Sequence, residues 1–280
     1  MLKMAPKLQR NAARSPATMP PLSMLGQDLL TVTATQRCYA LLLPLASAAS
    51  LALFAALGWP LAALLAAAAY TFYSYGSTSH DLVHGNLGLT RPLNHILLSI
   101  IELAGLRSGH AYQAAHLQHH ARFPHADDIE GAPAHGTLIG AVFAGPLHQL
   151  KVWCWAVRHA RRYRGWVIAE GLVCLATAIG ALACWPVTYA PAYYLALIVM
   201  GSWTFPLFTG YLPHDPKGAD TLSQTRRFRG SVAAVLFRQH LYHLEHHLYP
   251  AVPHQHWPDL AARLDPYFDR AGVPSIMLGF

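Results

Sequence analysis

Residues 61–84 read LAALLAAAAYTFYSYGSTSHDLVH, and this run decides the fold because it joins an apolar segment to a pair of histidines. The apolar part, residues 61–79, has close to the ~20 residues that an α-helix needs to cross the hydrocarbon core of a bilayer. His80 and His84 follow it at i, i+4 spacing, which on a helix brings both side chains to one face. The run therefore predicts a membrane-spanning helix that carries two histidines at one end.

Three further apolar segments of similar length lie at residues 39–57, 166–185 and 191–212. The four segments pair into two hairpins, whose turns at 58–60 and 186–190 contain no Lys or Arg. The 20 basic residues lie elsewhere: five before the first segment, eight between the second and third, and seven after the fourth. Because cytoplasmic loops carry an excess of Lys and Arg, we expect both turns to face outward and both termini to be cytoplasmic.

The composition agrees with a protein of the inner or plasma membrane. The chain is 54% hydrophobic and only 12% charged, whereas about a quarter of a typical soluble domain is charged. The net charge of +7 does not indicate nucleic-acid binding, because the basic residues form no stripe. The four cysteines have no paired spacing and are expected to be reduced.

Two shorter apolar stretches, residues 93–106 and 138–150, are expected to be helices in the cytoplasmic interface. The alternative is a fifth and a sixth span, which would keep the same sidedness. Glu170, near the start of the third span, is expected at the interface. Residues 1–37 are rich in Pro, Met and Arg and predict a flexible cytoplasmic arm, or alternatively a transit peptide. Residues 38–280 form the catalytic domain of this prediction, which is all-α.

The histidines carry the chemical signal. Eight of them fall into three groups: His80 and His84; His116, His119 and His120; and His243, His246 and His247. Their spacings of i, i+3 and i+4 bring imidazoles to one face of a helix, close enough to share a metal. Eight ring nitrogens are too many for one first-row metal and suit two. Six other histidines are interpreted as surface or interfacial residues: His95, His110, His125, His135, His148 and His159.

The type of ligand limits which metals are candidates. Imidazole suits zinc, copper, iron and nickel, but a structural zinc site is usually tetrahedral and rich in thiolate. A zinc protease would need HExxH, and the residues 243–247, HLEHH, have a different register. A bis-histidine haem protein would place its histidines within opposing spans. A pair of irons that activates O2 fits best.

The order HxxxH, HxxHH, HxxHH, with its first group after the second span and its last after the fourth, resembles the membrane fatty acid desaturase superfamily. That superfamily includes carotenoid β-ring hydroxylases and ketolases. The resemblance covers roughly residues 70–260 and implies a four-span helical fold whose cytosolic helical cap holds a di-iron centre. It implies that the eight histidines are ligands, together with His214 at the cytoplasmic end of the fourth span. It also implies O2 as co-substrate.

Carboxylates near these groups are candidates for orienting the ligands, because a ligating histidine usually donates its other N–H to an acid or a carbonyl. The candidates are Asp81, Asp127, Asp128, Asp215 and Glu245. The resemblance implies an acidic cluster after the second group, a place that Asp127 and Asp128 fill. The alternative is that these acids pair with surface arginines such as Arg122.

The substrate is expected to be a lipid, either a fatty acyl chain or a carotenoid. His84-Gly85, the YLPH of 211–214 and the HLEHHLYPAVP of 243–253 resemble the carotenoid branch, whereas the RFPHADD of 122–128 departs from it. No haem segment like that of cytochrome b5 occurs, so we expect a separate electron donor such as ferredoxin. Desaturation, hydroxylation and ketone formation all stay open. The competing class is a non-catalytic membrane protein that binds a metal or haem.

Overall fold

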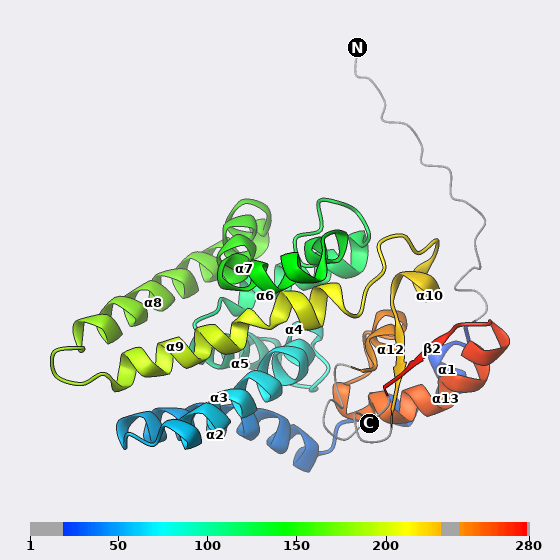
Figure 1. The fold of residues 1–280 in the computed structure, drawn as a ribbon. Helices are drawn as coiled ribbons and strands as arrows, with labels where there is room; N and C mark the ends of the chain where they lie inside the picture. The colour runs from blue at the N-terminus through cyan, green and yellow to red at the C-terminus, as the bar shows by residue number, and fades with distance from the viewer. Residues whose placement is uncertain (1–18, 231–240, 279–280) are drawn as a thin grey trace.

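A computed structural model describes residues 19–230 and 241–278, and this part of the chain is mostly helical (Figure 1). The four long apolar helices are α2 (Ala34–Ala56), α3 (Pro60–Tyr73), α8 (Arg164–Ala183) and α9 (Ala190–Trp203). Helix α2 packs along α3, α8 packs along α9, and α9 contacts both α2 and α3. The turns of both pairs lie at the same end of the molecule, away from α12 and α13 (Figure 1).

Three helical stretches are long and apolar enough to cross a membrane, judged by length and composition: Ala34–Ala56, Arg161–Ala183 and Ala190–Tyr211. They coincide with three of the four predicted spans. The remaining one, residues 61–79, does not meet the same criterion. Its α-helix ends at Tyr73, and the polar run SYGSTS follows. The count of four spans therefore stays a prediction.

Two π-helical segments lead from apolar helices to histidines. Segment η3 (Ser74–Ser79) continues α3 into α4 (His80–His84), and η6 (Pro206–Tyr211) follows α9 and ends three residues before His214. Helix α4 stops at Gly85, which adopts a left-handed conformation that glycine reaches at little cost. π-Helical turns are rare and are often found at functional sites. Their position directly before the histidines indicates that the functional site lies at this end of the bundle.

The helices between the two long pairs are α5 (Arg91–Ala104), α6 (Gly109–Arg122), the 3₁₀ turn η4 (Ala132–His135), α7 (Leu138–His159) and the 3₁₀ turn η5 (Arg161–Tyr163). Both helices predicted for the interface are present. Helix α7 is longer than expected because it continues through Pro146 to His159. Nothing in this arrangement tests their depth in a membrane.

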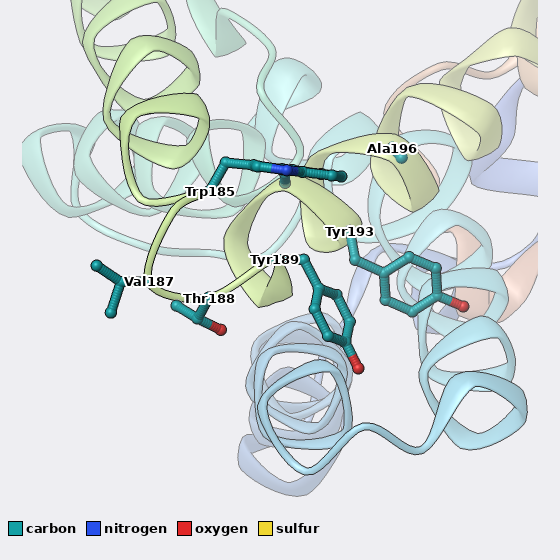
Figure 2. A pocket seen from close by; sticks show the side chains of 7 residues that line it. Trp185, Val187, Thr188, Tyr189, Tyr193 and Ala196 are labelled. Atoms are coloured by element: carbon teal, nitrogen blue, oxygen red, sulfur yellow. The ribbon is translucent and has the colours of Figure 1, made fainter.

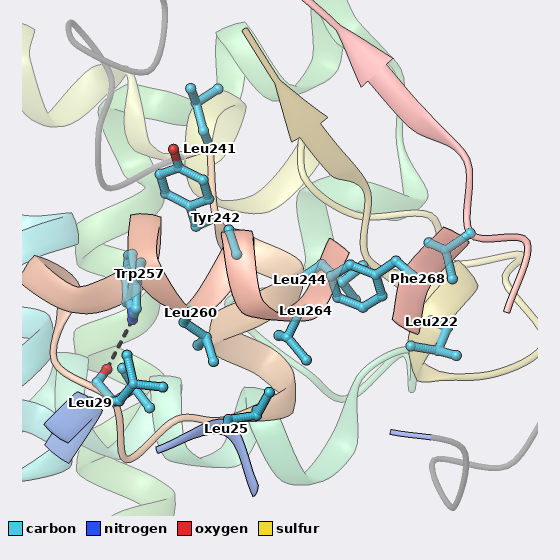
Figure 3. Close-up of a cluster of buried hydrophobic side chains, with 13 residues drawn as sticks. Leu25, Leu29, Leu222, Leu241, Tyr242, Leu244, Trp257, Leu260, Leu264 and Phe268 are labelled. Carbon is cyan, nitrogen blue, oxygen red and sulfur yellow. Dashed lines mark hydrogen bonds between the residues drawn. The ribbon is translucent and has the colours of Figure 1, made fainter. Parts of the chain in front are cut away.

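The C-terminal part forms a small cap over the bundle. Its elements are α10 (Thr221–Gln224), β1 (Arg227–Arg229), α12 (His243–Leu248), η7 (His254–His256), α13 (Trp257–Arg270) and β2 (Ser275–Met277). The strands β1 and β2 pair in parallel over three residues, a detail that the all-α prediction lacked. The core of the cap gathers Trp257, Leu260, Leu264 and Phe268 of α13 against Leu244 of α12 (Figure 3).

The N-terminal arm is only partly described. Residues 1–18 of the predicted arm lie outside the described residues, whereas α1 (Leu22–Leu25) and η2 (Gln27–Leu30) pack onto α13. Leu25 and Leu29 are buried in the core of the cap, and Arg263 of α13 binds Asp28. Residues 22–30 are therefore part of the folded body.

A buried ion pair joins the helices beneath the cap. Arg107 lies 2.6 Å from Glu102, and both side chains are almost fully buried. Arg107 also donates to Ser74 of η3 and Ser202 of α9, and Ser79 donates to Glu102. Because each charge has its partners, the pair links α5, η3 and α9 at one point.

Replacing Glu102 tests this link. Glu102→Ala would leave the Arg107 guanidinium buried without its counter-charge, so we expect a loss of about 3–5 kcal/mol of stability. Asp127→Ala is the matched control, because it removes the acid of the exposed Arg122–Asp127 pair and should change stability by less than about 1 kcal/mol. The stability of each variant is compared with that of the wild-type protein through the temperature at which the detergent-solubilised protein aggregates. Equal decreases of this temperature in the two variants would contradict a structural role for the buried pair.

Candidate metal centre

The nine histidines singled out in the sequence lie close together and divide into two clusters. The first cluster contains His80, His84, His116, His120 and His246, and the second contains His119, His214, His243 and His247. Within each cluster one potential ligand atom of every residue lies within 4.8 Å of all the others. Four segments meet here: α4, α6, α12 and the residues that follow η6.

In the first cluster the facing atoms are Nε2 nitrogens. The Nε2 atom of His246 lies 2.9 Å from that of His80 and 2.7 Å from that of His120, and His116 and His120 are 3.1 Å apart. The ring of His84 stands 5.0 Å from those of His120 and His246. Its Nε2 is buried and has no hydrogen-bond partner among the described residues.

The second cluster has the same construction. The Nε2 atom of His214 lies 3.0 Å from that of His119, 3.1 Å from that of His243 and 3.2 Å from that of His247. His243 and His247 are 3.1 Å apart, and His119 and His247 are 3.3 Å apart. One ring proton satisfies only one such contact, so a set of converging nitrogens leaves lone pairs facing each other.

The division of the clusters follows the helical spacing. Each i, i+4 pair stays in one cluster: His80 with His84, and His116 with His120 in the first; His243 with His247 in the second. The histidine at i+3 crosses to the other cluster, as His119 and His246 do. Helices α6 and α12 therefore each contribute to both clusters, and together they hold the clusters side by side.

Burial favours the neutral form of several of these rings. Desolvation, together with the neighbouring histidines, lowers the pKa values of His116, His246 and His247 well below their usual range. Desolvation likewise lowers the pKa of His84 to about 4. A metal ligand must be the neutral imidazole, so these four rings are in the form that binds a cation at neutral pH.

The opposite ring nitrogens of several histidines contact acceptors. Nδ1 of His119 lies 2.6 Å from Asp128, and Nδ1 of His116 lies 3.0 Å from Glu130. Nδ1 of His214 lies 2.7 Å from the carbonyl oxygen of Gly210. These contacts fix the tautomer, because the Nδ1 proton is donated outward and the Nε2 lone pair points into the cluster.

Among the acids predicted to orient the histidines, only Asp128 contacts a clustered ring. Asp127 pairs with Arg122 at the surface, as the alternative held. Asp81 binds His254 instead, with 2.6 Å between Oδ2 and Nδ1, and so ties α4 to η7.

Two further acids also serve other partners. Asp215 accepts from the backbone of Lys217 within a turn, and Glu245 pairs with Arg229. Within the described residues, the recorded partners of Asp81, Asp215 and Glu245 are therefore groups other than the clustered histidines.

Sequence reasoning missed two contributors to the site. Glu130 was not singled out, although it lies ten residues beyond the second histidine group and is buried. Burial raises the pKa of Glu130 well above its usual range. Trp257 packs its ring 5.3 Å from His80 and 5.2 Å from His246.

Glu170, which was expected at the interface, contacts neither cluster within the described residues. It is buried and accepts from Ser99 and Ser108.

A small cavity lies between the clusters. It is lined by His80 and His116 of the first cluster and by His243 of the second, with Tyr75 and Tyr112 on another side. Its volume is about 20 Å³, and a cavity needs roughly 10–15 Å³ to hold one water. One molecule of that size can therefore sit in contact with both clusters.

A larger hollow elsewhere has no comparable chemistry. It has a volume of about 450 Å³ and lies at the turn between α8 and α9, lined by Trp185, Tyr189 and Tyr193 (Figure 2). This turn is at the opposite end of α9 from His214. None of its lining residues is a histidine, an acid or a cysteine, so we assign no reaction to it.

Comparison with known families supplies an independent finding. The family model described as "Fatty acid desaturase" matches residues 54–279, which is most of the chain and includes all nine clustered histidines. Comparison with curated proteins finds no significant match. The chain belongs to the fatty acid desaturase family, and membership implies a membrane oxidoreductase that acts on lipid.

Proposed function

We propose that this protein is a membrane di-iron oxidoreductase that uses O2 and an external electron donor to oxidise a C–H bond of a lipid. The observation that carries the proposal is the convergence of nine imidazoles, five buried and four half-buried, into two adjacent clusters of five and four. Two clusters call for two cations, and family membership makes iron the metal to test first.

The donor set supports iron over a structural zinc site. The nitrogens of each cluster converge, because all its potential ligand atoms lie within 4.8 Å of one another and the shortest recorded Nε2 separation is 2.7 Å. Neither cluster of described residues contains a cysteine, whereas structural zinc sites are usually rich in thiolate.

The protein's part is to bind the metals, to orient the histidine rings and to exclude water from the cavity. His80, His116 and the other clustered rings would bind the metals through Nε2, while Asp128 and Glu130 hold two of the rings in the required tautomer. When bound, a pair of irons supplied with O2 and two electrons can remove hydrogen from an unactivated carbon. Trp257 closes one side of the cavity against water.

The membrane arrangement is part of the same proposal. We place four spans in the bilayer, including α3 with η3, and both hairpin turns on the outer side. The clustered histidines and both termini then lie in the cytoplasm. Large apolar side chains of the long helices project outward, such as Leu65 (63% exposed) and Leu175 (57% exposed). A bilayer would cover them, whereas soluble monomers rarely expose such patches.

The substrate is a fatty acyl chain or a carotenoid ring, and the reaction is desaturation, hydroxylation or ketone formation. The electron donor is a separate protein such as ferredoxin. Only the geometry around the reacting carbon distinguishes these outcomes, since all of them use the same kind of metal centre.

Metal content tests the centre itself. Detergent-purified protein should contain about two irons per chain, and His116→Ala or His243→Ala should lower the iron content and abolish product formation. His159→Ala is the matched control, because His159 is exposed and belongs to neither cluster. Zinc in place of iron, or the Soret band of a haem protein, would contradict the proposal.

Substitution of the acids that contact the histidines should weaken iron binding by a predictable factor. Asp128→Asn and Glu130→Gln keep the shape of each side chain but weaken its hold on the ring of His119 or His116, so we expect a 10- to 100-fold loss in iron affinity or activity. Asp127→Asn should change neither, because that side chain pairs with Arg122 at the surface. Iron titration of the apoprotein measures the affinity, and equal losses in all three variants would remove this role.

Product analysis identifies the reaction. We expect cells that make β-carotene and express this protein to contain new hydroxylated or ketonic pigments, new unsaturated fatty acids, or both. Pigments and fatty acids are profiled by chromatography and mass spectrometry, with His246→Ala as the inactive control. Identical profiles in the presence of a reducing system and bound iron would exclude both substrate classes.

A further inference from the structure

An apolar groove lies between α3 and α9, below the histidines. It has a volume of about 340 Å³ and is lined by Leu64, Ala68 and Phe72 from α3 and by Met200 and Thr204 on the side of α9. No charged residue lines it. The volume is at the lower end of the range of ligand sites, about 300–1,000 Å³. The groove therefore suits one ring or one end of a chain.

The groove is open on the outer face of the helix pair. Leu64, Met200 and Phe208 line it and are between 44% and 56% exposed. Its two helices approach closely at Gly201, where an added Cβ would lie 2.2 Å from the Oγ1 of Thr71. Only glycine allows this close approach. The two helices are therefore in contact at Gly201, and the groove lies beside this contact.

A stack of three aromatic rings separates the groove from the cavity beside the histidines. Phe205 lines the groove, and its ring stacks on Tyr75 with 3.9 Å between centroids. Tyr75 in turn stacks on Tyr112 at 4.1 Å, and both tyrosines line the cavity. Thr209 lines both spaces. The stacked rings of Phe205 and Tyr75 therefore lie between the two spaces.

A buried cation packs against the stack. The guanidinium of Arg107 lies 5.0 Å from the ring centre of Phe205 and 5.6 Å from that of Tyr75. Tyr75 belongs to the π-helix η3, and Phe205 immediately precedes the π-helix η6. The wall is thus built from the two segments whose hydrogen bonding departs from the regular α-helix.

We propose that this groove is the entrance for the substrate, which reaches the histidines sideways from the bilayer, and that Phe205 and Tyr75 form the gate between groove and cavity. The occupant is the hydrocarbon end of a membrane-dissolved lipid, without a charged group at the reacting end. The inference rests on the proposed function. It adds the route and the chemical class of the reacting end to that function.

A second space competes as an entrance. It has a volume of about 720 Å³ and lies where α2, η3 and the start of α13 meet. Its lining includes the polar side chains of Gln36, Gln255 and Asp259. It shares no lining residue with the cavity beside the histidines, whereas the groove shares Thr209. An apolar chain end is therefore better matched by the groove.

A pair of matched substitutions tests the route. Ala68→Phe fills the groove from an exposed position of α3, whereas Ala52→Phe adds the same ring at an exposed position of α2 that lines no described cavity. We expect Ala68→Phe to reduce product formation at least tenfold and to leave the iron content unchanged. Ala52→Phe should keep the wild-type rate.

Photolabelling gives a readout that does not depend on turnover. A diazirine-bearing fatty acid, irradiated with the full-length protein in detergent, should form adducts on residues such as Met200 and Thr204 that excess unlabelled fatty acid or β-carotene suppresses. Ala68→Phe should lose these adducts, and Ala52→Phe should keep them. Because labelling reports occupancy and iron content reports folding of the metal centre, a variant that keeps its iron but loses the adducts has a blocked groove, whereas a misfolded variant loses both.

The outcomes separate the two proposals. Loss of product and of suppressible adducts in Ala68→Phe alone supports the groove. If the wild-type protein binds two irons and forms product while Ala68→Phe behaves like Ala52→Phe, the groove is not the entrance and the proposed function stands. The same conclusion follows if Leu43→Trp, in the polar space, blocks the reaction and Ala68→Phe does not. A wild-type protein without iron overturns the proposed function instead.

Discussion

The structure depends on one constraint: nine imidazoles must be brought together at two points, five of them buried and the others half-buried. Desolvation keeps rings such as His116 and His246 neutral, and a buried nitrogen needs a partner. On the inward side the Nε2 atoms face one another, and we infer that bound cations accept their lone pairs. On the outward side Asp128, Glu130 and the Gly210 carbonyl complete the contacts.

The scaffold meets this constraint by interrupting its own helices. Apolar α3 and α9 each pass into a π-helical segment before reaching a histidine, and the buried Glu102–Arg107 pair links η3 and α9 to α5. Tyr75 of η3 and Phe205, next to η6, form the aromatic wall between the groove and the cavity. In our two proposals, the same junction between the apolar bundle and the polar cap would hold the metal and admit the substrate.

The acids that contact the outward-facing Nδ1 atoms of the histidines were the least predictable part of the site. Asp127 and Asp128 are neighbours in the chain, yet only Asp128 is buried against His119, whereas Asp127 faces Arg122 at the surface. Asp81 lies between two clustered histidines and serves His254 instead. Adjacency in sequence says little here, because side chains one residue apart on a helix or turn point in different directions. Glu130 is recognised only from its position in space.

The sequence alone determined the helical class, three of the apolar stretches and eight of the nine clustered histidines, since hydrophobic length and i, i+3, i+4 spacing are local properties of a helix. The ninth, His214, followed only from the family resemblance. Only the tertiary structure decided how the histidines divide, because that depends on how α4, α6 and α12 are oriented toward one another. It also decided which acids stand behind them and where an apolar groove approaches the site. The division and the groove depend on contacts between distant segments, such as His80 with His246, which no local pattern encodes. The acids depend on how the chain after α6 folds back onto it.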